Sequence, residues 1–166
     1  DLYRLRAATK TLDSPNEVVE MAQLALQQKQ AGEAKQVLDS AFASGLLGKG
    51  TEAERQKRLL ALASERAADA PNQLKQAEAE ALAAADGSDL VNIGLAYSGL
   101  GQHEKGIALM QQGIAKGKLK RADEANLHLG IAYLRAGQKA KAQQAFKSVG
   151  GTDGTADLAR LWMRVA

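Results

Sequence analysis

The segment 44–51 resembles a phosphate-binding loop in composition, because it carries three glycines and a lysine among small residues. It runs Ser-Gly-Leu-Leu-Gly-Lys-Gly-Thr. A nucleotide-binding P-loop has four residues between its glycines, Ser or Thr directly after the lysine, and a strand before it. Here two residues separate Gly45 from Gly48, Gly50 follows Lys49, and the preceding residues favour a helix. The segment is therefore predicted to be a loop between helices and not a nucleotide site.

Histidines and closely spaced carboxylates are the other candidates for metal binding or acid–base catalysis. The chain has two histidines, His103 and His128, and no cysteine. Neither histidine has an acidic pair at the i, i+4 spacing that would complete a metal site on a helix. Glu78 and Glu80 are two residues apart, so their side chains do not face each other on a helix. The sequence thus predicts no metal site, no cofactor, no catalytic residue and a non-enzymatic protein.

Four cations form a basic cluster between two of the predicted repeats: Lys116, Lys118, Lys120 and Arg121. Cations near the end of a helix are stabilised by the helix dipole, which gives the cluster a structural explanation. The alternative is a surface for an anionic partner or a peptide carboxylate. Aromatic residues that would stack on bases are not interleaved with these cations, and the formal net charge is only +3. A nucleic-acid partner is therefore not expected.

The composition indicates which elements must position these residues. Ala, Leu, Gln, Lys and Glu are abundant, aromatic residues make up 4%, and only Pro15 and Pro71 interrupt the chain. These residue types favour helix over strand, and no run of 18 apolar residues indicates a membrane span. The chain begins with Asp1 and not with Met, so we expect it to be a fragment of a longer protein. The prediction is an all-α fold.

Capping residues and glycines divide the chain into helical hairpins. Residues 14–17, Ser-Pro-Asn-Glu, and residues 51–54, Thr-Glu-Ala-Glu, both have the pattern of a helix start with a capping box. Pro71 is expected to begin a further helix, and Gly101 and Gly137 to break two later ones. The predicted repeats cover about 15–50, 52–86, 87–121 and 122–150, and a last helix at 153–166 is expected to cap the stack.

The two hairpins after residue 87 resemble the tetratricopeptide repeat. Residues 93–97 are Ile-Gly-Leu-Ala-Tyr, and 36 residues later 129–133 are Leu-Gly-Ile-Ala-Tyr, with Gly101 and Gly137 following at the same offset. In this family the helix glycine allows close approach of the second helix, the tyrosine fills the gap, and the turn glycine permits the reversal. The resemblance implies a single domain over 1–166, a solenoid of about four helical hairpins plus a C-terminal capping helix.

Three further segments, 21–27, 56–60 and 154–162, together resemble the C-terminal part of a group of exported proteobacterial proteins with this repeat. The resemblance covers nearly the whole chain and implies a bacterial, periplasmic protein. A cytoplasmic location is the alternative. The group brings no defined activity and no cofactor.

In this family the first helices of successive repeats line a concave groove, which the repeat frame places on two segments of this chain. The predicted partner-binding residues are Val91, Asn92, Leu95, Ser98, Leu127, Ile131, Leu134 and Arg135. Some relatives hold a peptide carboxylate with polar residues here, but Val91 and Leu95 are apolar, so such a clamp is not expected. An exposed apolar surface marks an interaction site. The open alternative is that other parts of the protein cover this face.

Two functions remain from these observations. The first is a non-catalytic protein–protein interaction scaffold that binds a protein or peptide segment in its apolar groove. The second is a structural or self-assembly element, because stacked repeats with an open end can continue into missing N-terminal repeats or into another copy of the chain, which would make it a homo-oligomer.

Overall fold

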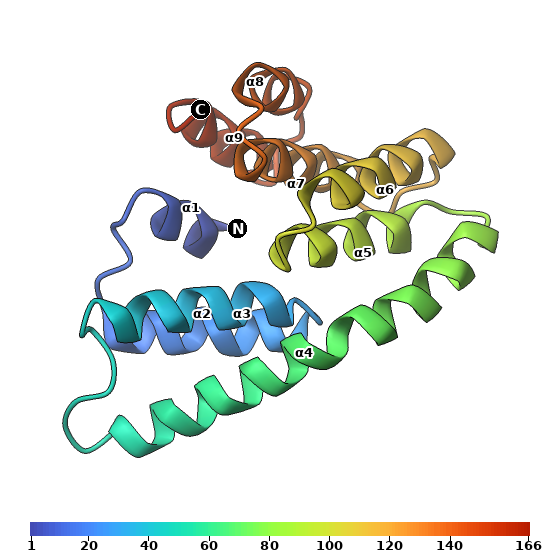
Figure 1. Cartoon of the computed structure of the whole chain (residues 1–166). Coiled ribbons are helices and arrows are strands. Elements are labelled where there is room, and N and C mark those ends of the chain that lie inside the picture. The colour runs from blue at the N-terminus through green and yellow to red at the C-terminus, as the bar shows by residue number, and fades with distance from the viewer. The chain divides into compact units, whose positions relative to one another are not determined.

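The computed structural model describes all residues, 1–166, and contains nine helices and no strand (Figure 1). The prediction of an all-α helical repeat fold is confirmed. No helix combines the length and the apolar character that crossing a membrane requires. The helices are α1 (Leu2–Ala8), α2 (Pro15–Gln27), α3 (Ala31–Ala43), α4 (Ala53–Ala83), α5 (Ser88–Gly99), α6 (His103–Lys116), α7 (Ala122–Arg135), α8 (Lys139–Lys147) and α9 (Thr155–Met163).

The helices form two compact units, Asp1–Asn72 and Gln73–Ala166, and the division falls within α4. The first unit contains α1, the α2–α3 hairpin and residues 53–72 of α4. The second contains residues 73–83 of α4, the hairpins α5–α6 and α7–α8, and α9.

The core of the first unit lies between α2, α3 and α4. Buried side chains from α2 and α3 include Val18, Ala22, Ala34 and Leu38, and Ala63 joins them from α4. Most are alanines, which let the helix axes approach closely while the larger Val and Leu fill the centre. Val18 and Ala22, and likewise Ala34 and Leu38, are four residues apart, which is the spacing of one helical face.

A buried ion pair connects α1 to α3. Arg4 and Glu33 are both buried. The single N–H of Arg4 Nε is shared between the two oxygens of the Glu33 carboxylate, and Nη2 donates to one of them, all at 2.7–2.9 Å. Arg4 Nη1 donates to Asp1 Oδ1 at 2.5 Å. This geometry compensates the desolvation of both charges, and losing one partner would leave the other uncompensated.

α4 corrects one prediction, because the helix expected to begin at Pro71 does not begin there. Ala53–Ala83 is a single helix of 31 residues with Pro71 inside it. A proline in a helix removes one backbone hydrogen bond and crowds the preceding turn, at a cost of about 3 kcal/mol. No glycine lies between 53 and 83, and Ala, Leu, Gln, Glu and Lys are abundant on both sides of Pro71. These helix formers continue the helix through the proline. The predicted repeat 52–86 is therefore one long helix and not a hairpin.

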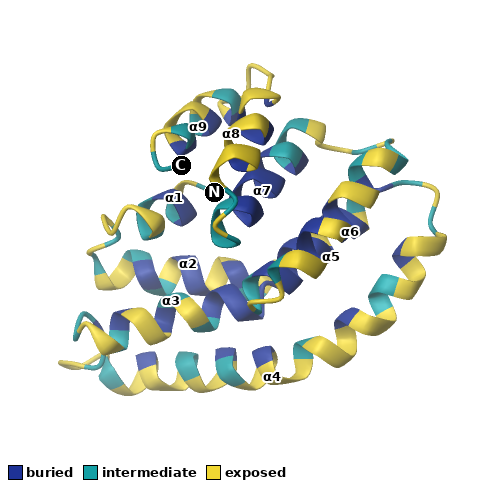
Figure 2. Ribbon diagram, turned by 45° about the horizontal axis from the view of Figure 1, so that its top comes forward, coloured by how far each residue is buried: buried dark blue, intermediate teal, exposed yellow.

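In the second unit the two hairpins stack, and α9 packs against α7 and α8. Figure 2 shows buried residues running along α5 and α7, whereas most of α4 is exposed. The largest fully buried side chains include Leu90, Met110, Leu127 and Phe146. Trp162 of α9 stacks on Phe146 with ring centroids 6.1 Å apart, which closes the end of the hairpin stack as expected of the terminal helix.

Glycines set the distance between α5 and α6. A Cβ added to Gly94 would lie 2.5 Å from the carbonyl oxygen of Gly106, and one added to Gly106 would lie 2.4 Å from the carbonyl oxygen of Gly94. Gly87 and Gly113 approach each other in the same way at the other end of the hairpin. The two backbones are therefore in direct contact, and no side chain fits between them.

Candidate functional site

The eight residues predicted to bind a partner lie on two helices that contact each other. Val91, Asn92, Leu95 and Ser98 are on α5, and the remaining four are on α7. The structure therefore brings the predicted set together, as the repeat frame requires.

Most of this set is not at the surface. Val91, Leu95, Ser98, Leu127 and Ile131 are all buried, none with more than 4% of its surface exposed. Asn92 is exposed, and Leu134 and Arg135 are half-buried. Partner binding by these residues stays a prediction. Because the other five residues of the set are buried, a partner can reach only the side chains of Asn92, Leu134 and Arg135.

Ser98 and His103 connect the end of α5 to the start of α6. Ser98 Oγ lies 3.2 Å from His103 Nδ1. Burial, followed by the positive charge of Arg135, lowers the pKa of His103 from its usual 6.5. The imidazole is therefore mainly neutral at pH 7 and can exchange a hydrogen bond with the hydroxyl. Because Ser98 is only 1% exposed, this contact holds the turn between the helices.

The second half of α4 is held to α5 and α6 through Tyr97. The Tyr97 hydroxyl donates to Glu78 Oε2 at 2.9 Å, and Lys105 Nζ lies 2.8 Å from the same oxygen and 4.0 Å from the centre of the Tyr97 ring. The hydrogen bond from Lys105 is the main cause that lowers the pKa of Glu78. Glu78 thus pairs with two residues of the next hairpin and not with Glu80.

The same arrangement recurs one repeat later around Tyr133. Gln111 Nε2 donates to the Tyr133 hydroxyl at 2.9 Å, and Lys141 Nζ lies 5.7 Å from the ring centre. Burial, followed by the charge of Glu104, raises the pKa of Tyr133. In each repeat the tyrosine hydroxyl therefore forms a hydrogen bond with a residue of the preceding helix. The ammonium group of a lysine in the same hairpin lies over the tyrosine ring. The lysines follow the tyrosines at equal spacing, a signal that the sequence contained.

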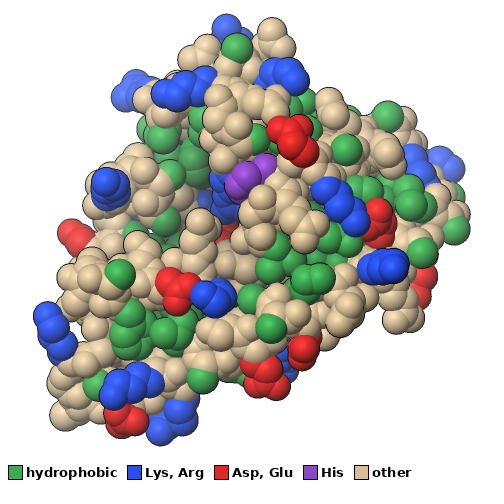
Figure 3. Space-filling model, in the orientation of Figure 1, with side chains coloured by type: hydrophobic (Ala, Val, Ile, Leu, Met, Phe, Trp, Pro, Cys, Tyr) green, Lys and Arg blue, Asp and Glu red, His purple; other side chains and the backbone are tan.

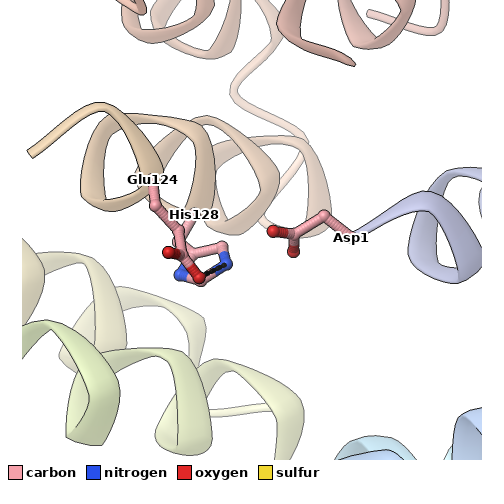
Figure 4. Close-up of side chains that lie close together, drawn as sticks. All are labelled: Asp1, Glu124 and His128. Atoms are coloured by element: carbon pink, nitrogen blue, oxygen red, sulfur yellow. Dashed lines mark ion pairs between the residues drawn. The ribbon is translucent and has the colours of Figure 1, made fainter. Parts of the chain in front are cut away.

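His128 has an acidic neighbour on its own helix. Its Nε2 lies 3.8 Å from Glu124 Oε1, one turn earlier on α7 (Figure 4). His128 is buried and Glu124 is half-buried. The i, i+4 spacing of this pair is visible in the sequence, although it provides one carboxylate and not the acidic pair that a metal site was expected to need.

The basic cluster divides between a structural contact and a solvated surface. Lys116 Nζ donates hydrogen bonds to the carbonyl oxygens of Ala81, Leu82 and Ala84 at 3.3, 2.7 and 2.6 Å. Ala81 and Leu82 belong to the last turn of α4 and Ala84 directly follows it, and the carbonyls at the end of a helix lack internal donors. Lys118 and Lys120 are exposed. On the face drawn in Figure 3, Lys and Arg are scattered among other side chains and form no continuous patch.

One cleft was not expected from the sequence. It lies in the first unit between α2 and the first half of α4 and has a volume of about 260 Å³. Its walls are Asn16, Val19, Gln23, Glu52, Arg55, Gln56, Arg58, Leu59 and Leu62. The residues come from segments more than 25 positions apart in the chain. Only the packing of α4 on the hairpin brings them together.

Comparison with known proteins identifies one segment of the chain. Residues 90–115 match the family model of the tetratricopeptide repeat. No curated protein and no solved structure matches the chain. The matched residues begin in the first turn of α5 and end in the last turn of α6, and they include Gly94, Tyr97 and Gly106, whose contacts are described above. The α5–α6 hairpin is therefore similar to a tetratricopeptide repeat.

Proposed function

We propose that this protein is a non-catalytic protein–protein interaction module. The observation that carries the proposal is the tetratricopeptide repeat at residues 90–115, stacked on a second hairpin with equivalent Gly and Tyr positions, Gly130 and Tyr133. Stacked repeats of this kind offer an extended surface in which the core residues hold the helices and the remaining positions can vary to suit a partner. Such a surface suits a protein or peptide ligand.

The contact surface proposed for the partner is the accessible edge of the predicted α5–α7 set. Asn92 is exposed on α5, and Leu134 and Arg135 are half-buried at the end of α7. An amide, an aliphatic chain and a guanidinium would bind a partner segment by combining hydrogen bonds with a small apolar contact. The buried Val91, Leu95, Leu127 and Ile131 would support this surface from below.

Affinity capture from an extract of the source organism tests this proposal. Charged substitutions at Leu95 or Ile131 would disturb the core, so the informative bait carries Asn92→Arg and Leu134→Glu. A control bait carries Gln112→Arg and Gln143→Glu, the same charge changes at exposed positions of α6 and α8. We expect a partner, identified by mass spectrometry, to be retained by the wild-type and control baits and lost from the first variant. Equal capture by all three folded baits would exclude this surface.

Self-assembly is the second candidate, and one observation favours it. Leu161 on the terminal helix α9 is 44% exposed, and an apolar side chain at the end of a repeat stack is suited to contact another copy. Light scattering over a hundredfold range of protein concentration tests this idea. We would expect mass to rise with concentration for the wild type and to stay monomeric for Leu161→Glu. A monomer throughout the range would refute it.

We also propose a periplasmic setting for the full-length protein. Its support is the resemblance of residues 21–27, 56–60 and 154–162 to exported proteins with this repeat. The absence of cysteines is compatible with that compartment. Fractionation of cells that express the natural full-length protein would show it in the periplasmic fraction, and recovery with cytoplasmic markers would contradict the proposal.

A further inference from the structure

The cleft between α2 and α4 has the composition of a binding site. From α2 it is lined by Asn16, Val19 and Gln23, which lie on one face of the helix at spacings of three and four residues. From α4 and the residue before it come the other six side chains. The cleft is somewhat smaller than the roughly 300–1,000 Å³ of pockets that enclose whole small ligands. Its size suits one or two side chains of a longer molecule.

The floor of the cleft is apolar. Val19 and Leu59 are half-buried and pack on the core of the α2–α3 hairpin. Leu62, one turn after Leu59 on α4, is 40% exposed. An apolar surface of this kind, bordered by polar side chains, is typical of an interaction site.

The rim of the cleft is rich in hydrogen-bond donors and positive charge. Arg55 and Arg58 are exposed, and Arg55 Nη1 lies 3.3 Å from the carboxylate of Glu52. Arg58 also lines the cleft. After the hydrogen bond from Lys57, the charge of Arg58 is a further cause that lowers the pKa of Glu54, one turn earlier on α4. Glu52 is the one acidic residue among the lining side chains. The lining of the cleft therefore carries two guanidinium groups and one carboxylate beside an apolar floor.

A buried amide adds a second donor. Gln56 lines the cleft and is only 7% exposed. Its Oε1 accepts a hydrogen bond from the backbone N–H of Gly48 at 2.8 Å, which fixes the orientation of the amide plane. Its Nε2 donates no hydrogen bond within the chain. An amide nitrogen at the cleft can donate to an acceptor of a ligand, and a carboxylate is the strongest acceptor that a protein ligand can supply.

We propose that this cleft binds an acidic segment of a partner protein. In the bound segment an aliphatic side chain lies on Val19, Leu59 and Leu62, and a neighbouring Asp or Glu carboxylate accepts hydrogen bonds from Arg58 and from Gln56 Nε2. The proposal rests on the interaction function proposed above and adds the chemistry of one ligand segment. It places this contact on the first unit, outside the repeat that the family comparison matches.

A titration with matched peptides tests the proposal directly. The probe is acetyl-Glu-Leu-Glu-Glu-Leu-amide, whose ends carry no charge, added to the ¹⁵N-labelled full chain and followed by ¹H–¹⁵N chemical shifts. Two control peptides replace either every Glu by Gln or every Leu by Ala. We expect shifts at the backbone amides of Gln23, Arg58 and Leu62 with the first peptide, and at least tenfold weaker binding of both controls.

Substitutions at exposed positions test the same contact from the protein side. Arg55→Gln with Arg58→Gln removes both cations of the rim, and we expect about tenfold weaker binding, which corresponds to two exposed ion pairs. Arg66→Gln is the matched control, because Arg66 is exposed on the same helix and does not line the cleft. Leu62→Ser should weaken binding of the acidic peptide, and the acidic peptide should still bind more tightly than the Gln peptide.

The outcomes separate this inference from the broader function. If the acidic peptide causes no shifts in the cleft, binds as weakly as its Gln counterpart, or responds equally to the Arg66 change, the cleft does not recognise acidic segments. Shifts at the amides of Asn92 and Leu134 instead would overturn the cleft proposal while supporting a partner site on α5 and α7. If the full chain captured a partner equally well with and without the substitutions at Arg55 and Arg58, the cleft proposal would likewise be overturned while the interaction function would be supported.

Discussion

Replacing Gly106 by Ala tests whether the α5–α6 hairpin depends on direct contact between its backbones. The added Cβ would lie 2.4 Å from the carbonyl oxygen of Gly94 and 2.9 Å from the backbone nitrogen of Ser98. Ordinary contact begins at 3.4 Å, so the distance to Gly94 is about 1 Å too short. The neighbouring atoms belong to the backbone of α5 and cannot rotate away, so the two helices must separate.

The expected change in stability is the difference between two opposing effects. Helix propensity favours Ala over Gly by about 1 kcal/mol. Overpacking a well-packed interface costs about 1–3 kcal/mol, and the upper part of that range applies because the obstacle is backbone. We therefore expect Gly106→Ala to lower the free energy of unfolding by about 2 kcal/mol. Urea unfolding followed by far-UV circular dichroism measures this change.

Ala108→Gly is the matched control for propensity. Ala108 is exposed in the same helix α6, so the substitution should cost about 1 kcal/mol from propensity alone. Both variants should therefore be less stable than the wild type, although one replaces Gly by Ala and the other replaces Ala by Gly. If Gly106→Ala instead stabilised the protein by about as much as Ala108→Gly destabilises it, the close approach of the backbones would not limit this hairpin.

Three further substitutions test contacts that hold the helices together. Lys116→Met removes the hydrogen bonds to the last turn of α4 and should cost about 1–2 kcal/mol, with faster amide hydrogen exchange at residues 78–84. Glu78→Gln removes the carboxylate whose pKa Lys105 lowers below its usual 4.5. In the wild type the ion pair stabilises the fold above that pH, and the stabilisation is lost as the pH falls through the lowered pKa. The free energies of unfolding of the two proteins should therefore differ by up to about 1 kcal/mol at pH 6 and not at pH 2. Arg4→Met leaves the buried Glu33 without its guanidinium, a loss of about 3 kcal/mol, which should appear as faster hydrogen exchange throughout α1.

Each of these variants has a control of the same chemistry at an exposed position: Lys118→Met, Glu80→Gln and Lys10→Met. Unchanged exchange in α4 or α1 would contradict the first or the third expectation. A difference between wild type and Glu78→Gln that persisted at pH 2 would show that the carboxylate contributes by something other than its charge.

Local signals in the sequence were sufficient to predict most helix boundaries. The starts near Pro15, Ala53 and Ser88 and the turns at Gly101 and Gly137 agree with the structure, because such signals act over a few neighbouring residues. The expected side-chain cap is not formed at Ser14, which makes no capping hydrogen bond. Pro71 was the exception. Whether a proline ends a helix depends on two free energies, the cost of the proline and the stability of the helical segments on both sides of it. For Pro71 that comparison involves all residues from 53 to 83.

The contacts around the repeat tyrosines could be predicted only in part. The recurrence of Gly94 and Tyr97 as Gly130 and Tyr133 identified the repeat, since each pair is defined by spacing along the chain. The pairing of Glu78 with Tyr97 and Lys105 was missed, because it joins α4 to a hairpin that begins after a loop. Spacing along one helix had placed Glu78 only in relation to Glu80.

The sequence by itself determined the class of fold and the position of the hairpins α2–α3, α5–α6 and α7–α8, because propensity, turn signals and periodicity are properties of short segments. The tertiary structure alone decided which apolar faces are covered. Periodicity shows that Leu95 and Ile131 lie on an apolar face, but the same pattern results whether that face meets solvent, a partner or another helix. Only packing showed that these side chains are buried, and only packing brought Val19 and Arg58 into the lining of one cleft.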